Sequence, residues 1–557
     1  MSKFDDLLEQ LGTGVWNVFV VVAMCYWVPQ IVNQEMGAAF LTPDLAHTCR
    51  LPSDAASAAS NDTRSQCSYN ATTSSGSTEE RSCIEWDFDD STFTNTITSE
   101  FSLVCGRSYL RAAFKSVYFL GGFFGAMLNG WLSDSNADDH RELATAQVAF
   151  PTIPRQLLSI AHIILLLTLD AISRTPPASA AALEVNEPKY RTAVGVLVFL
   201  PYALAVIVLG GYGYLLRDWR WLSVTTSLPC LLFLPMLLFL DESPRWLIVR
   251  GRYEDALRVL RKAARWNKAQ LPPEEELRAL MDHIRKEALE ADKEDDATTS
   301  GHVKSLKNIM KDVTVLVRYS GGYLNEYCNG AMEERVTKKM RSITLLFYAL
   351  FFVLGMVYYG LSFGADKLRV DPFVYMAVSG VMEVPSSTVS IPLAEKMGRR
   401  ASSTLFLVAT AGSLLVLGFI PDALEWLVVT MAMLGRLTIT VAFQIVYLYA
   451  SEIFPTEVRV RGLGTCTMMG TVGAMLAPFI WEILGSIKAW VPLFMFGVAA
   501  LVASVTTFWL PESRTAPMLD TVASLEAAHS GAKEAGPVQL DREMADISVK
   551  ETDAQEA

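Results

Sequence analysis

The sequence has few of the side chains on which catalytic and metal sites depend. Only six of its 557 residues are histidines, and they are scattered along the chain. No two cysteines are spaced as Cys-x-x-Cys, and no phosphate-binding glycine loop follows a predicted strand. The glycine-rich "GGYGYLL" at residues 210–216 lies in an apolar stretch, where small residues serve close helix packing. We therefore expect neither an enzyme nor a bound metal or cofactor.

Charged residues are also scarce, at 19% of the chain, whereas 51% of the residues are hydrophobic. The apolar residues come in blocks of about twenty, long enough for a helix to cross a hydrocarbon core of roughly 30 Å. The formal net charge of −12 owes much to the tail after Pro511 and to the loop after Asp241. It indicates neither nucleic acid nor an acidic substrate as a partner. The sequence predicts an all-α polytopic protein of the lipid bilayer.

Eleven apolar blocks are expected to span the membrane. They lie at residues 15–37, 111–133, 156–172, 193–215, 221–240, 342–363, 372–394, 402–420, 424–448, 463–484 and 489–510. The acidic start of the chain fits a cleavable signal peptide poorly, so the first block should remain as a span. We expect four regions: an N-terminal bundle (1–240), a cytoplasmic loop (241–341), a C-terminal bundle (342–510) and an acidic cytoplasmic tail (511–557). Two similar halves around a central loop are typical of transporters.

The polar loop at residues 42–107 carries the marks of the outer face. It contains two glycosylation sequons, at Asn61 and Asn70, and four of the eight cysteines: Cys49, Cys67, Cys83 and Cys105. Cysteines clustered beside sequons predict two disulfides outside the cell, with their pairing open. Unrelated free thiols in a disordered loop are the alternative.

The central loop opens with an amphipathic pattern at residues 242–270. Apolar residues recur there at helical spacing, namely Leu247, Ala256, Val259, Leu260 and Ala263, with charges between them. The pattern predicts one amphipathic helix beneath the bundle, and its basic content places the loop in the cytoplasm.

Two ionisable residues, Glu383 and Arg436, interrupt the apolar spans of the C-terminal half. A charge inside the membrane costs several kcal/mol unless it faces water or a partner, so such residues are functional candidates. They could form a structural ion pair, or one of them could meet the charge of a substrate. Phe351 and Tyr358 are seven residues apart and share a helix face, and aromatic faces attract organic cations by roughly 0.5–2 kcal/mol each. Simple packing is the alternative for these two rings.

Several motifs resemble the organic cation, anion and carnitine transporter family of the major facilitator superfamily. They are "CIEWDFDDSTFTNTITSEFSLVC" (83–105), "RDWRWLSVTTSLP" (217–229), "DESPRWLIVRGRYEDALRVLRKAA" (241–264), "VYYGLS", "SGVMEVPSSTVSIPLAEKMGRR" and "YLYASEIFPTEVRVRGLGT". The resemblance covers most of residues 10–525. It implies the major facilitator fold, with twelve helices in two six-helix bundles and both termini in the cytoplasm. It also implies alternating-access transport of a small organic ion across the plasma membrane, and it leaves the oligomeric state open.

The resemblance implies six substrate-binding positions: Phe351, Tyr358, Glu383, Arg436, Gln444 and Thr471. Cation-transporting members have aromatics at the first two positions and an acid at that of Glu383. At the position of Thr471, cation carriers have an aspartate, whereas anion and carnitine carriers have an arginine. Charge selectivity therefore rests on Glu383 and Arg436, and we expect an organic cation. An organic anion or a carnitine-like zwitterion is the alternative.

Two other classes of protein fit less well. A receptor or adhesion protein using the disulfide loop would not need charged residues in the membrane. A sugar carrier of the same superfamily would not be expected to have the 83–105 motif.

Charged residues at cytoplasmic helix ends match the gating motifs of the family. They are Asp134, Arg155, Glu184, Arg191, Glu242, Arg245, Arg399, Arg400, Glu452, Arg459 and Glu512. Carboxylates and arginines there can pair in one state of a rocking transporter and separate in the other. Static neutralisation of helix ends is the alternative.

Two stretches depart from the family pattern. About twenty extra residues, at 135–154, interrupt the turn between the second and third spans, and the apolar body of the fourth span is absent. Residues 174–192 cannot replace that body, because three prolines and several charges prevent a fully hydrogen-bonded spanning helix. With eleven spans, the basic 241–341 loop would face outside, against the positive-inside tendency. We expect an alternatively spliced or mis-assembled version of a twelve-span transporter; a divergent carrier with a short, buried fourth segment is the alternative.

Overall fold

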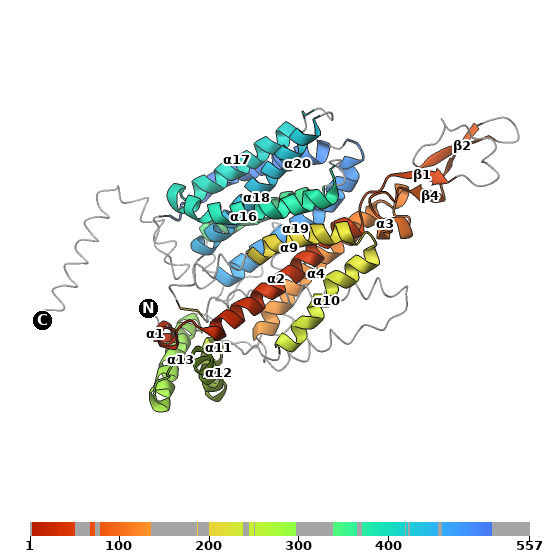
Figure 1. Ribbon diagram of the computed structural model, residues 1–557. Helices are drawn as coiled ribbons and strands as arrows, with labels where there is room; N and C mark the ends of the chain where they lie inside the picture. Colours follow the sequence, from red (N-terminus) through yellow and green to blue (C-terminus); the bar gives the residue numbers. More distant parts are fainter. Residues whose placement is uncertain are drawn as a thin grey trace, which may run out of the picture.

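Long helices run side by side through the centre of the computed structural model, and smaller elements lie at its two ends (Figure 1). The structure describes residues 3–50, 67–72, 78–134, 186–187, 200–237, 244–249, 251–296, 338–364, 370–417, 419–420, 424–454, 459–488 and 490–514. Ten of the eleven expected spans coincide with helices in these ranges. The expected span at 156–172 and the inserted residues 135–154 lie outside them.

The long helices fall into two groups along the chain. The N-terminal group contains α2 (Val15–Leu41), α4 (Tyr109–Asp134), α9 (Leu200–Leu215) and α10 (Trp219–Leu237). The C-terminal group contains α15 (Lys338–Ser362), α16 (Pro372–Met397), α17 (Arg399–Leu417), α18 (Glu425–Ile453), α19 (Arg459–Gly485) and α20 (Trp490–Thr506), which is followed by a 3-10 turn at Thr507–Trp509. Within the described ranges, α2, α15, α17, α18, α19 and α20 are long and apolar enough to cross a membrane. The chain is thus a multi-pass helical membrane protein.

Glycines decide how closely these helices approach one another. A Cβ added to Gly355 of α15 would lie 2.1 Å from the carbonyl oxygen of Gly470 on α19. A Cβ on Gly473 would meet the backbone of α15 at the same distance. Between the halves, a Cβ on Gly210 of α9 would lie 2.9 Å from the carbonyl oxygen of Phe373 on α16. Small residues thus bring backbones into contact, as expected for the glycines of residues 210–216.

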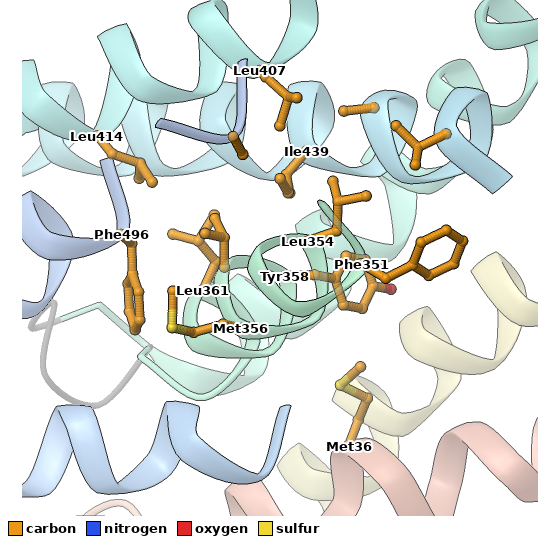
Figure 2. Packing of buried hydrophobic residues seen from close by; sticks show 14 of the residues in the cluster. Met36, Phe351, Leu354, Met356, Tyr358, Leu361, Leu407, Leu414, Ile439 and Phe496 are labelled. Carbon is orange, nitrogen blue, oxygen red and sulfur yellow. The ribbon is translucent and has the colours of Figure 1, made fainter. Parts of the chain in front are cut away.

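The largest apolar core surrounds α15 (Figure 2). Phe351, Leu354 and Leu361 point outward from this helix and are fully buried. Leu414 of α17 and Phe496 of α20 belong to the same cluster. From Leu350 to its end, α15 is therefore enclosed by its neighbours, so polar groups on this part must find partners inside the protein.

The outer loop forms two small antiparallel sheets rather than an irregular coil. Strand β1 (His47–Arg50) pairs with β4 (Glu85–Phe88), and β2 (Ser68–Thr72) pairs with β3 (Thr78–Ser82). Disulfides join Cys49 to Cys83 and Cys67 to Cys105, which confirms the expectation of two bridges and fixes their pairing. Of the two sequons, Asn70 lies in β2 and Asn61 lies outside the described residues; glycosylation stays a prediction.

The short helix α3 (Ile97–Glu100) connects this loop to α10. Glu100 accepts a hydrogen bond from Nε1 of Trp219 at 2.9 Å and pairs with the guanidinium of Arg220. Burial raises the pKa of Glu100, but these donors outweigh it and hold the pKa below its ordinary value. The ionised carboxylate thus fastens the loop to the bundle.

The opposite end of the bundle carries α1 (Lys3–Leu11), α11 (Pro244–Val249), α12 (Tyr253–Asn267) and α13 (Glu274–Asp296) (Figure 1). The five apolar residues predicted for the amphipathic face are all buried here. The prediction of one continuous helix is wrong, because Gly251 has a positive φ of 77° and separates α11 from α12. Leu7, Leu8 and Leu11 of α1 complete this cluster, so the start of the chain packs on the central loop.

Candidate functional site

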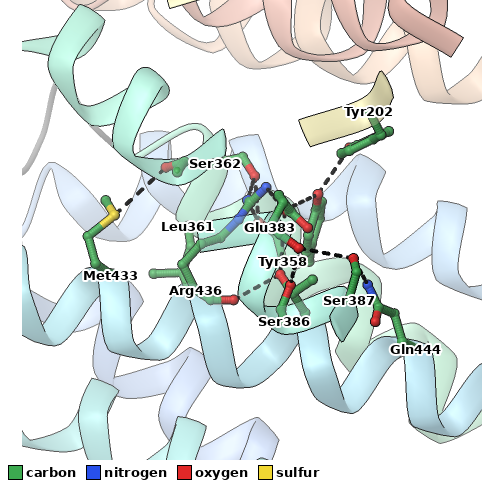
Figure 3. A network of polar contacts seen from close by, with 12 residues as sticks. Tyr202, Tyr358, Leu361, Ser362, Glu383, Ser386, Ser387, Met433, Arg436 and Gln444 are labelled. Carbon is green, nitrogen blue, oxygen red and sulfur yellow. Dashed lines mark hydrogen bonds and ion pairs between the residues drawn. The ribbon is translucent and has the colours of Figure 1, made fainter. Parts of the chain in front are cut away.

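A buried ion pair lies at the centre of the C-terminal half (Figure 3). Nη2 of Arg436 on α18 lies 2.9 Å from Oε1 of Glu383 on α16, and both side chains are at least nine-tenths buried. Nη1 of Arg436 donates to the backbone carbonyl of Tyr358 and to Oγ of Ser362, both on α15. Three helices of this half therefore meet at one guanidinium.

Tyr358 completes the site from α15. Its hydroxyl donates to Oε1 of Glu383 at 2.9 Å, and its ring lies under the guanidinium, 3.8 Å from Cζ of Arg436. The hydroxyl is also 3.0 Å from that of Tyr202 on α9, in the N-terminal group. The network therefore crosses between the halves, and the two tyrosine hydroxyls form the crossing point. A carboxylate, a guanidinium and an aromatic face here have the chemistry to bind an organic ion.

Aromatic rings extend the site along α15. Phe351 and Tyr358 share a face, as their spacing predicted, and both contact Phe443 of α18, with ring centroids 6.0 and 6.1 Å apart. Phe351 also packs near Tyr447 and is fully buried. Phe351 is thus part of the packing behind the site, whereas Tyr358 joins the polar network.

Of the other two residues predicted to bind the substrate, Gln444 is linked to the ion pair by hydrogen bonds and Thr471 bonds within its own helix. Nε2 of Gln444 donates to Oγ of Ser387, which itself donates to the backbone carbonyl of Glu383, so Gln444 joins the network one turn away. Thr471 is buried on α19, and its hydroxyl donates to the carbonyl of Thr467 in the same helix. Thr471 thus carries no charge at the position where related carriers have an aspartate or an arginine, as the sequence indicated.

Several members of the network were not predicted from the sequence. Tyr202 and Ser362 are hydroxyl residues in apolar spans, where nothing distinguishes them from helix-packing residues. Glu35, on α2, is different, because it is a buried carboxylate within the expected span 15–37. The rule that selected Glu383 would have selected it as well.

A charged cluster lies at the end of the C-terminal half where α17 begins and α18 ends. Nη2 of Arg399 lies 2.7 Å from Oε1 of Glu452, so the start of α17 is tied to the end of α18. Glu512, after α20, accepts hydrogen bonds from the backbone N–H groups of Arg399 and Arg400 at 2.9 and 3.2 Å. Because these N–H groups begin α17, the carboxylate of Glu512 caps that helix and offsets the partial positive charge at its N-terminus.

The other residues that the sequence predicted to act in gating cannot be placed relative to this cluster. Arg155, Glu184, Arg191 and Glu242 lie outside the described residues, as do the side chains of Asp134, Arg245 and Arg459. Arg459 was expected at the end of the helix that carries Glu452. It instead begins α19, because α18 ends at Ile453, with Phe454 extended as its cap, and Pro455 follows in the sequence.

A second ion cluster joins the two halves near the end that carries the disulfide loop. Arg111, in the first turn of α4, pairs with Asp44, which follows α2. Its Nη2 also lies 2.7 Å from Oε1 of Glu482 on α19. One turn further along α4, Oγ of Ser116 donates to the carbonyl of Met475 at 2.6 Å. The start of α4 and the C-terminal part of α19 are therefore bonded together.

Known proteins share both the sequence pattern and the fold. The family model described as "Sugar (and other) transporter" matches residues 157–520. An organic cation transporter protein of Drosophila melanogaster is 28% identical, over 93% of this chain and 94% of its own length. Solute carrier family 22 member 7 of Bos taurus is 30% identical over 79% and 75%. Organic cation/carnitine transporter 2 of Homo sapiens is 28% identical over 80% and 75%.

Solved structures agree on the architecture. The inward open xylose transporter XylE from E. coli superposes with a TM-score of 0.55 at 12% identity, covering 92% of this chain and 98% of the other. A second structure of this major facilitator superfamily symporter gives a TM-score of 0.52 at 14% identity, covering 93% and 99%. At such low identity the match shows the major facilitator fold alone.

Proposed function

Because the chain belongs to the sugar (and other) transporter family, and within it to solute carrier family 22, we propose that it carries small organic cations across the plasma membrane. It is a membrane-embedded carrier of small organic ions rather than an enzyme. The preference for cations, the plasma membrane and the roles of single residues are the proposed parts. The observation that carries the proposal is the buried network of Glu383, Arg436 and Tyr358.

The network supports a cation as the substrate because of how its charges are arranged. Arg436 already occupies Oε1 of Glu383 and stacks on the ring of Tyr358. A substrate cation can compete for the same carboxylate and the same ring, since both attract positive charge. A carnitine-like zwitterion would use both members of the ion pair, with its carboxylate at Arg436.

Alternating access gives the network its mechanical role. We assign residues 1–240 and 342–510 to the two moving halves, residues 241–341 to the cytoplasmic loop and residues 511–557 to the tail. The hydroxyl contact between Tyr202 and Tyr358 joins α9 to α15 and must break when the halves separate there. A substrate that binds Glu383 takes the acceptor of the Tyr358 hydroxyl, so binding changes the hydrogen bonding of the group that contacts Tyr202. The cluster of Arg399, Glu452 and Glu512 would change its pairing at the cytoplasmic end.

The membrane potential supplies a driving force for a cation without any coupled ion. At roughly 2.3 kcal/mol per charge per 100 mV, an inside-negative potential of that size concentrates a monovalent cation about fiftyfold. Depolarised cells should therefore accumulate far less substrate.

The test is uptake of labelled tetraethylammonium and para-aminohippurate by cells expressing this chain, with surface biotinylation. We expect tetraethylammonium uptake that falls on depolarisation and is lost in Glu383→Gln. Glu254→Gln, at an exposed position of α12, is the matched control and should transport normally. Uptake of para-aminohippurate alone would replace the cation proposal with an anion carrier. Intracellular retention without uptake would show that residues 135–190 make this chain a non-functional isoform.

A further inference from the structure

A second carboxylate, Glu35 of α2, lies inside the membrane part of the N-terminal half. Its side chain is 6% exposed, and its Oε1 accepts a hydrogen bond from the hydroxyl of Tyr359 on α15 at 3.0 Å. Placing a carboxylate in an apolar helix is costly, so such a residue is a functional candidate. Glu35 is not part of the ion pair between Glu383 and Arg436, so the proposed function above does not use it.

Two adjacent tyrosines of α15 form hydrogen bonds to Glu35 and Glu383, one tyrosine to each carboxylate. Tyr358 donates to Glu383, and the next residue, Tyr359, donates to Glu35. The two tyrosine rings contact each other edge to face, with centroids 5.1 Å apart. Arg436 contacts Glu383, so its guanidinium is engaged within the C-terminal half. The carboxylate on the other side of the tyrosine pair belongs to the opposite half.

Aromatic rings from both halves pack against Tyr359, the hydroxyl partner of Glu35. Phe119 of α4 contacts Tyr359 edge to face at a centroid distance of 4.6 Å, and Phe363 stacks on Tyr359 at 6.2 Å. Negative aromatic faces next to a carboxylate are the combination that binds alkylammonium ions in proteins. Lys115 of α4 is itself buried, and its ammonium lies 5.6 Å from the centroid of the Phe363 ring, so a substrate cation would compete with Lys115 for this ring.

We propose that Glu35 binds the positive charge of the transported organic cation on the N-terminal half, in competition with the hydroxyl of Tyr359. The proposal rests on the proposed function and adds the residue that decides charge selectivity. The bond between Tyr359 and Glu35 crosses from one half to the other. A cation that takes the place of the hydroxyl releases this bond, so substrate binding itself loosens the contact between α2 and α15.

Three variants test the proposal in the full-length carrier. Glu35→Gln removes the charge and keeps the shape, and Glu35→Asp keeps the charge on a shorter side chain. Tyr359→Phe removes the competing donor. Glu9→Gln, an exposed carboxylate of α1, is the control. We expect KM for tetraethylammonium to rise at least tenfold in Glu35→Gln, to rise less in Glu35→Asp and to fall in Tyr359→Phe. A KM within twofold of wild type in Glu35→Gln would overturn the proposal.

Binding to the purified protein separates this proposal from the proposed function. Tetraethylammonium should raise the melting temperature of the wild-type carrier and of Glu9→Gln, but not that of Glu35→Gln. If the wild type binds tetraethylammonium in this way but transports nothing, the proposed function fails while the role of Glu35 stands. If Glu35→Gln does not fold, the KM for tetraethylammonium of Tyr359→Phe tests the proposal instead. A purely structural bond would give an unchanged or higher KM in that variant, and this result would overturn the proposal.

Discussion

Removing one member of the buried ion pair should destabilise the protein more than removing both. Glu383→Gln leaves the guanidinium of Arg436 charged and enclosed, because its neighbours are Ser362, a backbone carbonyl and the ring of Tyr358. Breaking a buried pair in this way costs about 3–5 kcal/mol. The double variant Glu383→Gln with Arg436→Met carries no buried charge at this point and should lie within about 1 kcal/mol of wild type.

The difference follows from the burial of both partners. The side chain of Arg436 is 2% exposed and that of Glu383 is 7% exposed, so water cannot replace the missing partner. A matched surface pair, Arg278 with Glu254, is 44% and 74% exposed, and neutralising Glu254 should change nothing measurable. Each single variant should cost about 3–5 kcal/mol and the double variant no more than about 1 kcal/mol, so a double-mutant cycle should give a coupling energy of at least about 5 kcal/mol.

The assay is denaturant unfolding of the purified single and double variants in detergent micelles, with uptake measured alongside. We expect the double variant to recover stability without recovering transport, because the charges that we propose to meet the substrate are gone. A double variant as unstable as Glu383→Gln would refute the reasoning, since the cost would then come from lost packing rather than from an unpaired charge.

Two further variants probe helix packing and the cytoplasmic cluster. Gly355→Ala places a methyl group against the carbonyl of Gly470 and should lower the free energy of unfolding by about 1–3 kcal/mol, whereas Gly464→Ala of α19, with open space around it, should not. Arg399→Gln removes the ion pair with Glu452 and should lower kcat for uptake with little change in KM, because this cluster lies at the helix ends and not at the ion-binding network. Lys396→Gln is its charge-matched control, and a changed KM in Arg399→Gln alone would contradict a gating role.

The spans were predictable because each is a long apolar block, and block length alone decides whether a helix can cross a bilayer. Contacts between helices were not, because they join residues far apart in the sequence. Arg436 contacts Ser362 across 74 residues, and Tyr202 meets Tyr358 across 156. Hydropathy records neither which face a hydroxyl occupies nor which helix lies opposite.

The central loop shows where a periodic pattern gives incomplete information. The spacing of Leu247, Ala256 and Val259 correctly identified the buried face of the loop helices. It did not reveal the break at Gly251, because the apolar residues on both sides continue the same periodicity. Nor did it reveal α1 as the partner of that face, since a periodic pattern indicates that a surface is buried without showing which segment covers it.

Because the first helix packs against the central loop, this part of the carrier is assembled late during synthesis. Helix α1 ends at Leu11, and the helix that covers it, α12, begins only at Tyr253. At roughly 5–20 residues per second, the ribosome needs about 12–50 s to make the intervening chain. Through that interval Leu7, Leu8 and Leu11 have no native surface to cover them. We therefore expect these leucines to stay exposed on the nascent chain during membrane insertion, and a bulky tag fused to the N-terminus should disturb their later packing on α12.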